Sequence, residues 1–141
     1  MLCAVLPLFG FGLVPLSQPE PALLEQTNVF VAGQDGAFEY RIPGIITPNQ
    51  GTLIVFCDAR MREEVDPPND IDLVMKRSGA GRRTWGPLRT MVDNGPGAAA
   101  DSCGFVDRQT GSLWIFSVYA PEGVGRYNAA DGLAGGSGLK S

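Results

Sequence analysis

The chain has 141 residues, with 11 Lys and Arg residues against 15 Asp and Glu residues, and a net charge of -4. Because no block of basic residues occurs, nucleic acids and anionic membrane surfaces are poor candidates as partners. The sequence contains no histidine, which excludes a Ser-His-Asp or Cys-His catalytic group and any histidine-ligated metal site within this chain.

The N-terminal stretch is almost wholly apolar, and no acidic or basic side chain occurs before Glu20. This pattern is typical of a secretory signal peptide. Pro7 and Pro15 are unfavourable in a membrane-spanning helix, so no stable span is expected. The sequence therefore predicts a signal peptide over residues 1–22, a secreted or periplasmic protein, and one domain over residues 23–141.

Short β-type runs separated by turn residues make up most of the remaining sequence. No segment has a sustained 3.6-residue apolar period, so we predict an all-β domain. The last stretch, Ala120–Ser141, has no apolar period and is predicted to be a loop without a further strand. The predicted strands are Asn28–Ala32, Ile42–Thr47, Thr52–Asp58, Ile71–Arg77, Leu88–Val92, Gly104–Val106 and Ser112–Tyr119.

Two of these strands are apolar on both faces, over residues 53–56 and 113–116. An antiparallel sheet with one solvated face would alternate between apolar and polar residues instead. We therefore expect both strands to be buried on two sides, as in a β-sandwich or in the blades of a β-propeller.

An internal repeat favours the propeller. The sequence Gly-Thr-Leu-Ile-Val-Phe at 51–56 recurs sixty residues later as Gly-Ser-Leu-Trp-Ile-Phe at 111–116, and at this offset Gly44 aligns with Gly104. A repeat of this length holds about one four-stranded blade. Two such units cannot close a ring, so the sequence predicts an incomplete β-propeller of about one and a half to two blades.

The same offset places Arg41 opposite Asp101, each at the start of an equivalent strand in adjacent units. In a propeller such strand starts meet near the central axis on one face. We therefore expect this cation and this carboxylate to line one cavity.

The tetrapeptide Tyr40-Arg41-Ile42-Pro43 is a candidate binding motif. Pro43 fixes its own φ and is expected to hold Ile42 extended, which gives Arg41 a defined direction. A guanidinium matches a carboxylate with two parallel hydrogen bonds, whereas a lysine offers only a point charge. The motif alone is equally compatible with an ordinary surface arginine at a strand start.

A second arginine, Arg60, and an aspartate of the following loop, Asp66, come directly behind the strand expected to pair with that of Arg41. These groups can converge on one anionic ligand. No cofactor is predicted. A zinc site is not expected because the cysteines lack CxxC spacing, and no loop has the ligand spacing of a dedicated calcium site. Cys57 and Cys103 lie in apolar runs and are expected to be buried thiols, although a disulfide between them is compatible with export.

In this order and spacing, these residues resemble the sialidases (neuraminidases) of the Asp-box, six-bladed β-propeller type, over roughly residues 30–119. The resemblance rests on the Tyr-Arg-Ile-Pro motif, on Arg60 nineteen residues after Arg41, and on Asp66 six residues later. A degenerate Asp box from Ser78 to Trp85 and the segment Asp101-Ser102-Cys103 complete it.

The resemblance implies a role for each residue. Arg41 would be the first of three arginines that hold the sialic acid carboxylate, and Asp66 would be the acid/base residue on a loop. Arg60 and Asp101 would contact the sugar near its 4-hydroxyl. Asp70 is a rival for the acid role, because Pro67-Pro68 leaves the loop register open. The plain interpretation of Asp70, and of Asp72 beside it, is solvation at a turn and a strand edge.

The resemblance also implies the activity. The protein would be an exo-α-sialidase that removes terminal sialic acids from glycans, glycoproteins or glycolipids with retention, through a tyrosine nucleophile outside this fragment. Its glutamate partner and two further arginines are expected beyond Ser141, so the chain alone should lack catalytic competence. A trans-sialidase would share every motif present here.

The Asp box departs from the family pattern, because Ala80 replaces its aspartate and Arg82 its glycine. Two other functions remain open from the sequence. One is a non-catalytic propeller that binds sialylated or other acidic glycans with the same pocket. The other is a structural propeller fragment in which the arginines only form ion pairs.

Overall fold

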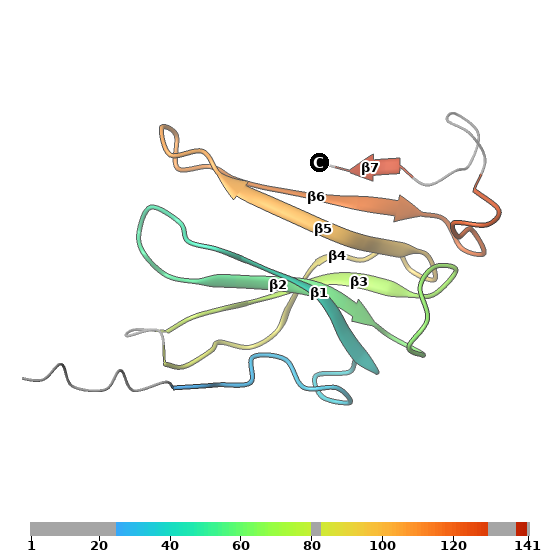
Figure 1. The fold of residues 1–141 in the computed structure, drawn as a ribbon, viewed down its shortest axis with the longest axis horizontal. Helices are drawn as coiled ribbons and strands as arrows, with labels where there is room; N and C mark the ends of the chain where they lie inside the picture. The colour runs from blue at the N-terminus through green and yellow to red at the C-terminus, as the bar shows by residue number, and fades with distance from the viewer. Residues whose placement is uncertain (1–24, 80–82, 130–137, 141) are drawn as a thin grey trace, which may run out of the picture.

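The computed structural model of the chain describes residues 25–79, 83–129 and 138–140, so the predicted signal peptide lies outside the described residues. The described chain is all-β, as predicted, and contains seven strands (Figure 1). Over these ranges, no helix has the length and apolar character needed to cross a membrane.

The first four strands form an antiparallel sheet in chain order. They are β1 (Glu39–Ile46), β2 (Ile54–Arg60), β3 (Ile71–Arg77) and β4 (Arg89–Val92). Each of them overlaps a strand that the sequence predicts. This sheet is therefore one complete four-stranded unit of the predicted architecture.

The remaining strands form a second unit above the first in Figure 1. They are β5 (Ala98–Val106), β6 (Leu113–Ala120) and β7 (Gly138–Lys140). A single parallel pairing, Ile71 with Ala98, joins β5 to β3. The predicted absence of a strand after Ala120 is wrong, because β7 pairs antiparallel with β6. So short a strand is defined by backbone pairing at an edge, and an apolar pattern cannot reveal it.

The core lies on both faces of β2. On one face Phe56 packs with Ile46, Leu73 and Ala99, between the first sheet and the second unit. On the other face, Cys57, Ala59 and Val74 form a cluster with Ala37. All seven residues of β2 are buried, which confirms the expected two-sided burial of this strand.

The segment before β1 covers the second face without forming a strand, so the prediction of a strand at Asn28–Ala32 is wrong. Its apolar residues pack instead: the Phe30 ring lies 5.1 Å from that of Tyr40, and Lys76 Nζ lies 5.4 Å from the Phe30 ring. Lys76 also pairs with Asp35 at 2.6 Å. The segment turns back on itself, with the Gln34 N–H donating to the Val31 carbonyl, and so does not extend along the sheet.

For β6 the expected two-sided burial is wrong. Trp114 is 46% exposed, and Phe105 of the neighbouring strand is 52% exposed. The rings of Phe105, Trp114 and Phe116 lie stacked, with centroids 6.1–6.4 Å apart. An apolar face of the second unit therefore stays open to solvent in the described chain.

Cys57 and Cys103 are both free thiols, so no disulfide joins them. Cys57 is buried as expected, and burial raises the pKa of its thiol to about 12. Cys103 is exposed, contrary to the expectation, because it lies on the side of β5 that faces away from the core.

The turn between β3 and β4 coincides with the degenerate Asp box. Ser78 and Trp85 form a β-bridge, and the Gly79 N–H donates to the Thr84 carbonyl at 2.7 Å. Backbone pairing between the two arms of the turn therefore closes it. Ala80 and Arg82, the departures from the family pattern, lie outside the described residues.

Matching β-bulges in β1 and β5 show how the two hairpins correspond. The pairs that flank the bulge are Arg41–Asp58 and Gly44–Phe56 in the first hairpin, and Ala100–Val118 and Cys103–Phe116 in the second. In each, two residues face one residue of the partner strand, and the first of the two has a positive φ, +53° at Ile42 and +52° at Asp101. The repeat is therefore real, down to an irregularity of the backbone.

The bulges also correct the predicted register. The offset is 60 residues from Asp58 to Val118, but 59 residues from Arg41 to Ala100. Asp101 is therefore equivalent to Ile42, and the predicted pairing of Arg41 with Asp101 is wrong by one residue. The cause is the turn: the Gly51 N–H donates to the carbonyl three residues back, whereas the Gly111 N–H reaches four residues back.

Candidate active site

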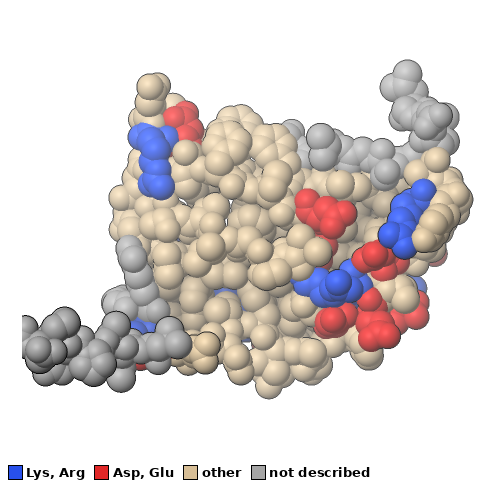
Figure 2. Space-filling model, viewed as in Figure 1, with Lys and Arg blue, Asp and Glu red and all other residues tan. Residues whose placement is uncertain are grey.

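The two hairpins enclose a cavity of about 370 Å³ at the end of the sheets that carries the bulges. In Figure 2, acidic and basic side chains gather at this end, and most of the remaining visible face is uncharged. The lining residues are Arg41, Ile42, Asp58, Arg60, Asp66, Pro67, Ile71, Ala100, Asp101, Val118, Ala120, Gly125 and Arg126. The structure thus brings together all four predicted site residues: Arg41, Arg60, Asp66 and Asp101.

Arg41 lies in β1 directly before the bulge and is exposed to the cavity. No carboxylate of the described chain pairs with its guanidinium. The prediction that Pro43 holds Ile42 extended is wrong, because Ile42 has a left-handed φ of +53°. The bulge forces this conformation by placing Ile42 and Pro43 opposite the single residue Cys57. A β-branched residue there is strained, and such strain is often found at functional sites.

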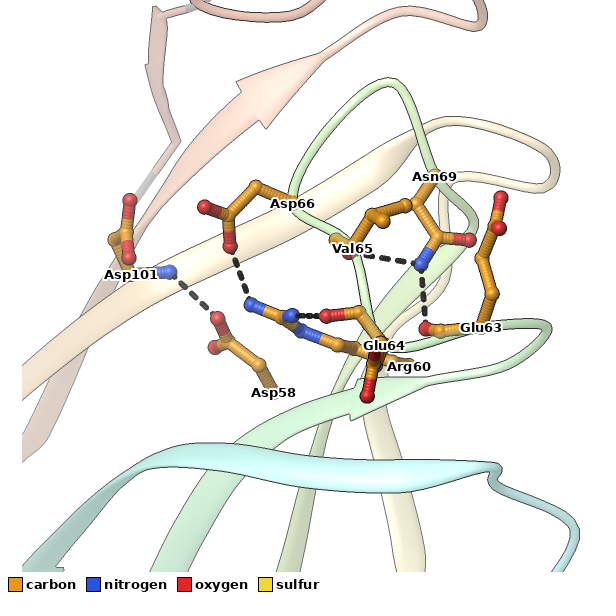
Figure 3. A network of polar contacts seen from close by, with 8 residues as sticks. All are labelled: Asp58, Arg60, Glu63, Glu64, Val65, Asp66, Asn69 and Asp101. Carbon is orange, nitrogen blue, oxygen red and sulfur yellow. Dashed lines mark hydrogen bonds and ion pairs between the residues drawn. The ribbon is translucent and has the colours of Figure 1, made fainter.

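Arg60 ends β2 and is only 2% exposed, in contrast to Arg41. Its guanidinium donates to Asp66 Oδ1 and to the Glu64 carbonyl (Figure 3). Its Nε is buried without a hydrogen-bond partner in the described chain. Arg60 therefore acts as a fixed internal cation that ties the following loop to the cavity.

The loop from Met61 to Asp70 carries Asp66 above the guanidinium of Arg60 (Figure 3). The Met61 N–H donates to the Asp70 carbonyl at 2.9 Å and closes the base of the loop. Inside it, buried Asn69 donates to the Glu63 and Val65 carbonyls at 3.0 and 2.9 Å. Asp66 itself is 59% exposed, so its carboxylate is held at the rim of the cavity, within reach of a ligand.

The rival residue, Asp70, points elsewhere. Its carboxylate pairs with Arg62 at 3.4 Å and does not line the cavity. The sequence suggested that Asp72 is solvated at a strand edge. In the structure it is instead buried in β3, with 7% exposure. Burial, together with the nearby charges of Asp93 and Asp70, raises the pKa of Asp72 to about 6. The geometry therefore favours Asp66 over Asp70 as the loop carboxylate of the site.

Asp58 is a site residue that sequence reasoning missed. It is 1% exposed and lines the cavity from β2, beside Arg41. The Asp101 backbone N–H donates to its Oδ2 at 3.0 Å (Figure 3), while Oδ1 is buried without a hydrogen bond in the described chain. Burial raises the pKa of Asp58 to about 6, against the opposing effect of this hydrogen bond. An aspartate next to a fully apolar strand was the signal available in the sequence.

Arg126 is the second missed residue. It lines the cavity from the loop after β6 and stacks on Tyr127, with 4.6 Å between its guanidinium carbon and the ring centroid. This loop packs on the Asp66 loop: a Cβ added at Gly125 would lie 2.2 Å from the Pro67 carbonyl oxygen. Only glycine permits so close an approach, so the two loops are fitted to each other.

No group of three or more metal-binding side chains occurs in the part of the chain that the structure describes. The charged residues that line the cavity are three arginines and three aspartates. Such a set can bind an anionic, hydroxyl-rich ligand and can hold a carboxyl group near it for proton transfer.

Comparisons of sequence and of structure both find sialidases. The chain is 34% identical over 106 residues to a sialidase of Micromonospora viridifaciens, and 30% identical over 106 residues to a sialidase of Bacteroides fragilis. The solved structure of the Hadza microbial sialidase Hz136 superposes on 77% of the chain with a TM-score of 0.68 and 30% identity. The chain is similar in sequence and fold to a segment of these sialidases. No family model matches the sequence.

The sialidase match covers much of this chain but little of its relatives. It includes 72% and 70% of the chain, but only 16% and 19% of the Micromonospora and Bacteroides proteins. The chain likewise covers 24% of the Hadza sialidase structure. The fold is that of a sialidase β-propeller, of which the described residues form one four-stranded unit and part of a second.

Proposed function

We propose that this chain is part of an exo-α-sialidase that hydrolyses terminal sialic acids from glycoproteins, glycolipids or free glycans. One observation carries the proposal: Arg41, without a carboxylate partner in the described chain, faces the same cavity as Asp66 and Asp101. The sialidase relatives support it through their identity over this segment.

Arg41 would bind the sialic acid carboxylate. That carboxylate is ionised near neutral pH, and the guanidinium can give it two parallel hydrogen bonds. Arg41 is suited to this task because its charge is not already neutralised. Arg60 is neutralised by Asp66, so we assign Arg60 and Asp101 to the sugar hydroxyls, near the 4-position.

Asp66 would act as the general acid and base. It lies at the cavity rim on a loop, where a carboxyl group can reach the glycosidic oxygen of a substrate that enters carboxylate first. In this mechanism the bound sugar takes over contacts of Arg60, and Asp66 turns towards the leaving oxygen. Proton donation to that oxygen helps the bond to the aglycone break.

The nucleophile would be a tyrosine outside residues 1–141, giving retention of configuration. The substrate carboxylate lies next to the reacting carbon, so a second anionic nucleophile would be repelled, whereas a phenol is neutral. This use of tyrosine is the exception that sialidases form among glycosidases.

Ligand binding tests the role of Arg41. Isothermal titration of the 141-residue chain with N-acetylneuraminic acid should show binding, and Arg41→Lys should weaken it roughly 10- to 100-fold, since hydrogen bonds to charged groups contribute about 1.5–3 kcal/mol. Arg108→Lys is the matched control, because Arg108 lies in the distant β5–β6 turn. Equal affinities for the two variants would refute the assignment of Arg41.

Catalysis is tested in a chimera that carries this segment in place of the matching 106 residues of the Micromonospora sialidase. It should hydrolyse sialosides, and Asp66→Asn should lower turnover of natural sialosides by about 10²- to 10⁴-fold. An activated aryl leaving group, which needs less protonation, should recover much of this loss. A chimera that binds sialic acid but hydrolyses neither substrate would instead favour the non-catalytic glycan-binding propeller.

A further inference from the structure

Asp58 is placed to connect the two hairpins at the base of the cavity. It belongs to β2, and its carboxylate reaches across to the backbone of β5, 43 residues further along the chain. The side chain is 1% exposed, so this contact is shielded from water. Backbone pairing between the two units is limited to Ile71 with Ala98 in the described chain, which makes a side-chain link at Asp58 more important.

The partner of Asp58 is a strained residue. Asp101 is the first residue of the β5 bulge, with a φ of +52°. The ladder between β5 and β6 skips from Ala100 to Cys103, so the Asp101 N–H is not paired with β6. Asp58 Oδ2 supplies the acceptor that the bulge lacks, at 3.0 Å. An aspartate tolerates the left-handed conformation better than most residues, but the conformation still needs support.

We propose that Asp58 is a positioning residue: its carboxylate holds the β5 bulge in the conformation that directs Asp101 into the cavity that Arg41 also lines. The proposal deepens the proposed function, on which it rests for what Asp101 would contact. The hydrogen bond itself can be tested without any ligand.

The charges around Asp58 fit a hydrogen-bond role better than an ion-pair role. The guanidinium of Arg60, on the same strand, is taken up by Asp66 and the Glu64 carbonyl (Figure 3). Arg41 stands opposite on β1 and is exposed, while Asp101 adds a like charge from β5. Burial raises the pKa of Asp58 to about 6. The bulge is therefore held most firmly above this pH, where the acceptor is an ionised carboxylate.

Nuclear magnetic resonance of the 141-residue chain tests the link directly. An amide that donates to a carboxylate moves its proton resonance downfield when that carboxylate ionises. The Asp101 amide proton should therefore shift downfield as the pH rises through about 6. In Asp58→Asn, which keeps an acceptor oxygen but does not titrate, this shift should be lost.

The control variant is Asp101→Asn, which removes the carboxyl group of residue 101 but keeps its backbone amide. Its amide should still titrate near pH 6, because the titrating group is Asp58. An Asp101 amide that does not titrate between pH 4.5 and about 8, or one whose titration disappears in Asp101→Asn, would overturn the proposal. If Asp58→Asn fails to fold, this second variant still decides between the outcomes. Loss of sialic acid binding with an intact titration would count against the proposed function alone.

Discussion

The β1–β2 and β5–β6 hairpins line the cavity with four pairs of equivalent residues, and the members of each pair differ in chemistry. The pairs are Arg41 and Ala100, Ile42 and Asp101, Asp58 and Val118, and Arg60 and Ala120. Three charged residues of the first hairpin thus correspond to small or apolar residues of the second. At the first residue of the bulge the difference is reversed: the first hairpin has the apolar Ile42, and the second has the charged Asp101.

This difference separates what the repeat specifies from what the site needs. The bulge, the glycine turn and the strand pairing recur, so they belong to the scaffold. The charged side chains occur once, so they belong to the function. A cavity with one polar and one largely apolar wall can orient a sugar that has a carboxylate on one side and carbon surface on the other.

Burial also differs between the hairpins, and the largest expected effect tests this difference. Phe56 of β2 is 2% exposed and Trp114 of β6 is 46% exposed. Phe56→Ala should lower the free energy of unfolding of the chain by about 3–5 kcal/mol, as for other buried aromatic residues. Trp114→Ala should cost less than about 1 kcal/mol, because the ring already contacts water. Urea denaturation measures both, and equal losses would mean that the second hairpin is as buried as the first.

The scaffold was largely predictable from the sequence for a physical reason. Strands such as β2 and β3 must be apolar and β-branched to fill a core, and glycine is needed where the turn has a positive φ, as at Gly51 and Gly111. The one-residue error of register arose because the extra residue in the second turn was hidden by the chance alignment of Gly44 with Gly104. The segment around Phe30 was mistaken for a strand because its apolar residues pack without a partner strand.

The site was predictable only for the residues that match the spacing of the resembled family. Arg41, Arg60, Asp66 and Asp101 follow a recognisable spacing, and all of them line the cavity. The contact of Asp58 is with a backbone amide far away in sequence, so its only local sign is an aspartate that follows an apolar run. Arg126 lies in a loop whose place is set by Gly125 packing on Pro67, another contact between distant segments.

The buried acids of the first sheet predict the next largest effect. Asp58 and Asp72 have pKa values raised to about 6, mainly by burial. Between about pH 4 and pH 6 the folded chain keeps these protons while the unfolded chain loses them, so stability should fall as the pH rises. Each pKa unit corresponds to about 1.4 kcal/mol, so two shifts of about two units set an upper limit of about 6 kcal/mol. Solvent screening around these carboxylates reduces that limit, and a total fall of about 1–3 kcal/mol is expected.

Asp72→Asn isolates one of these acids away from the cavity. The variant should be more stable than the parent chain at pH 7, similar to it near pH 4, and less dependent on pH in between. Val118, the counterpart of Asp58 in β6, does not titrate, so Val118→Ala should leave the shape of the pH profile unchanged. A parent chain whose stability rises steadily from pH 4 to 6 would contradict the raised pKa values.

A smaller effect distinguishes the residues after the two bulges. A Cβ added at Gly44 would lie 2.3 Å from Phe56 Cζ, whereas the equivalent Cys103 is exposed. Gly44→Ala should therefore cost about 1–3 kcal/mol of stability through overpacking, and Cys103→Ala almost nothing. The double variant Gly44→Ala, Phe56→Leu should recover part of the loss relative to the sum of its single variants. Simple additivity in denaturation experiments would show that the Phe56 ring does not set the requirement for glycine.

The smallest effect concerns the first residue of each bulge. Ile42 and Asp101 share a left-handed φ, but only the aspartate is suited to it. Left-handed conformation costs an ordinary residue about 1–2 kcal/mol, and glycine loses about 0.5–1 kcal/mol through its flexibility, so Ile42→Gly should stabilise the chain by about 0.5–1 kcal/mol. Ile45→Gly, elsewhere on β1 and 61% exposed, should destabilise it. If the strain at Ile42 serves to aim Arg41, the more stable variant should bind N-acetylneuraminic acid more weakly, and an unchanged affinity would show that the strain belongs to the scaffold alone.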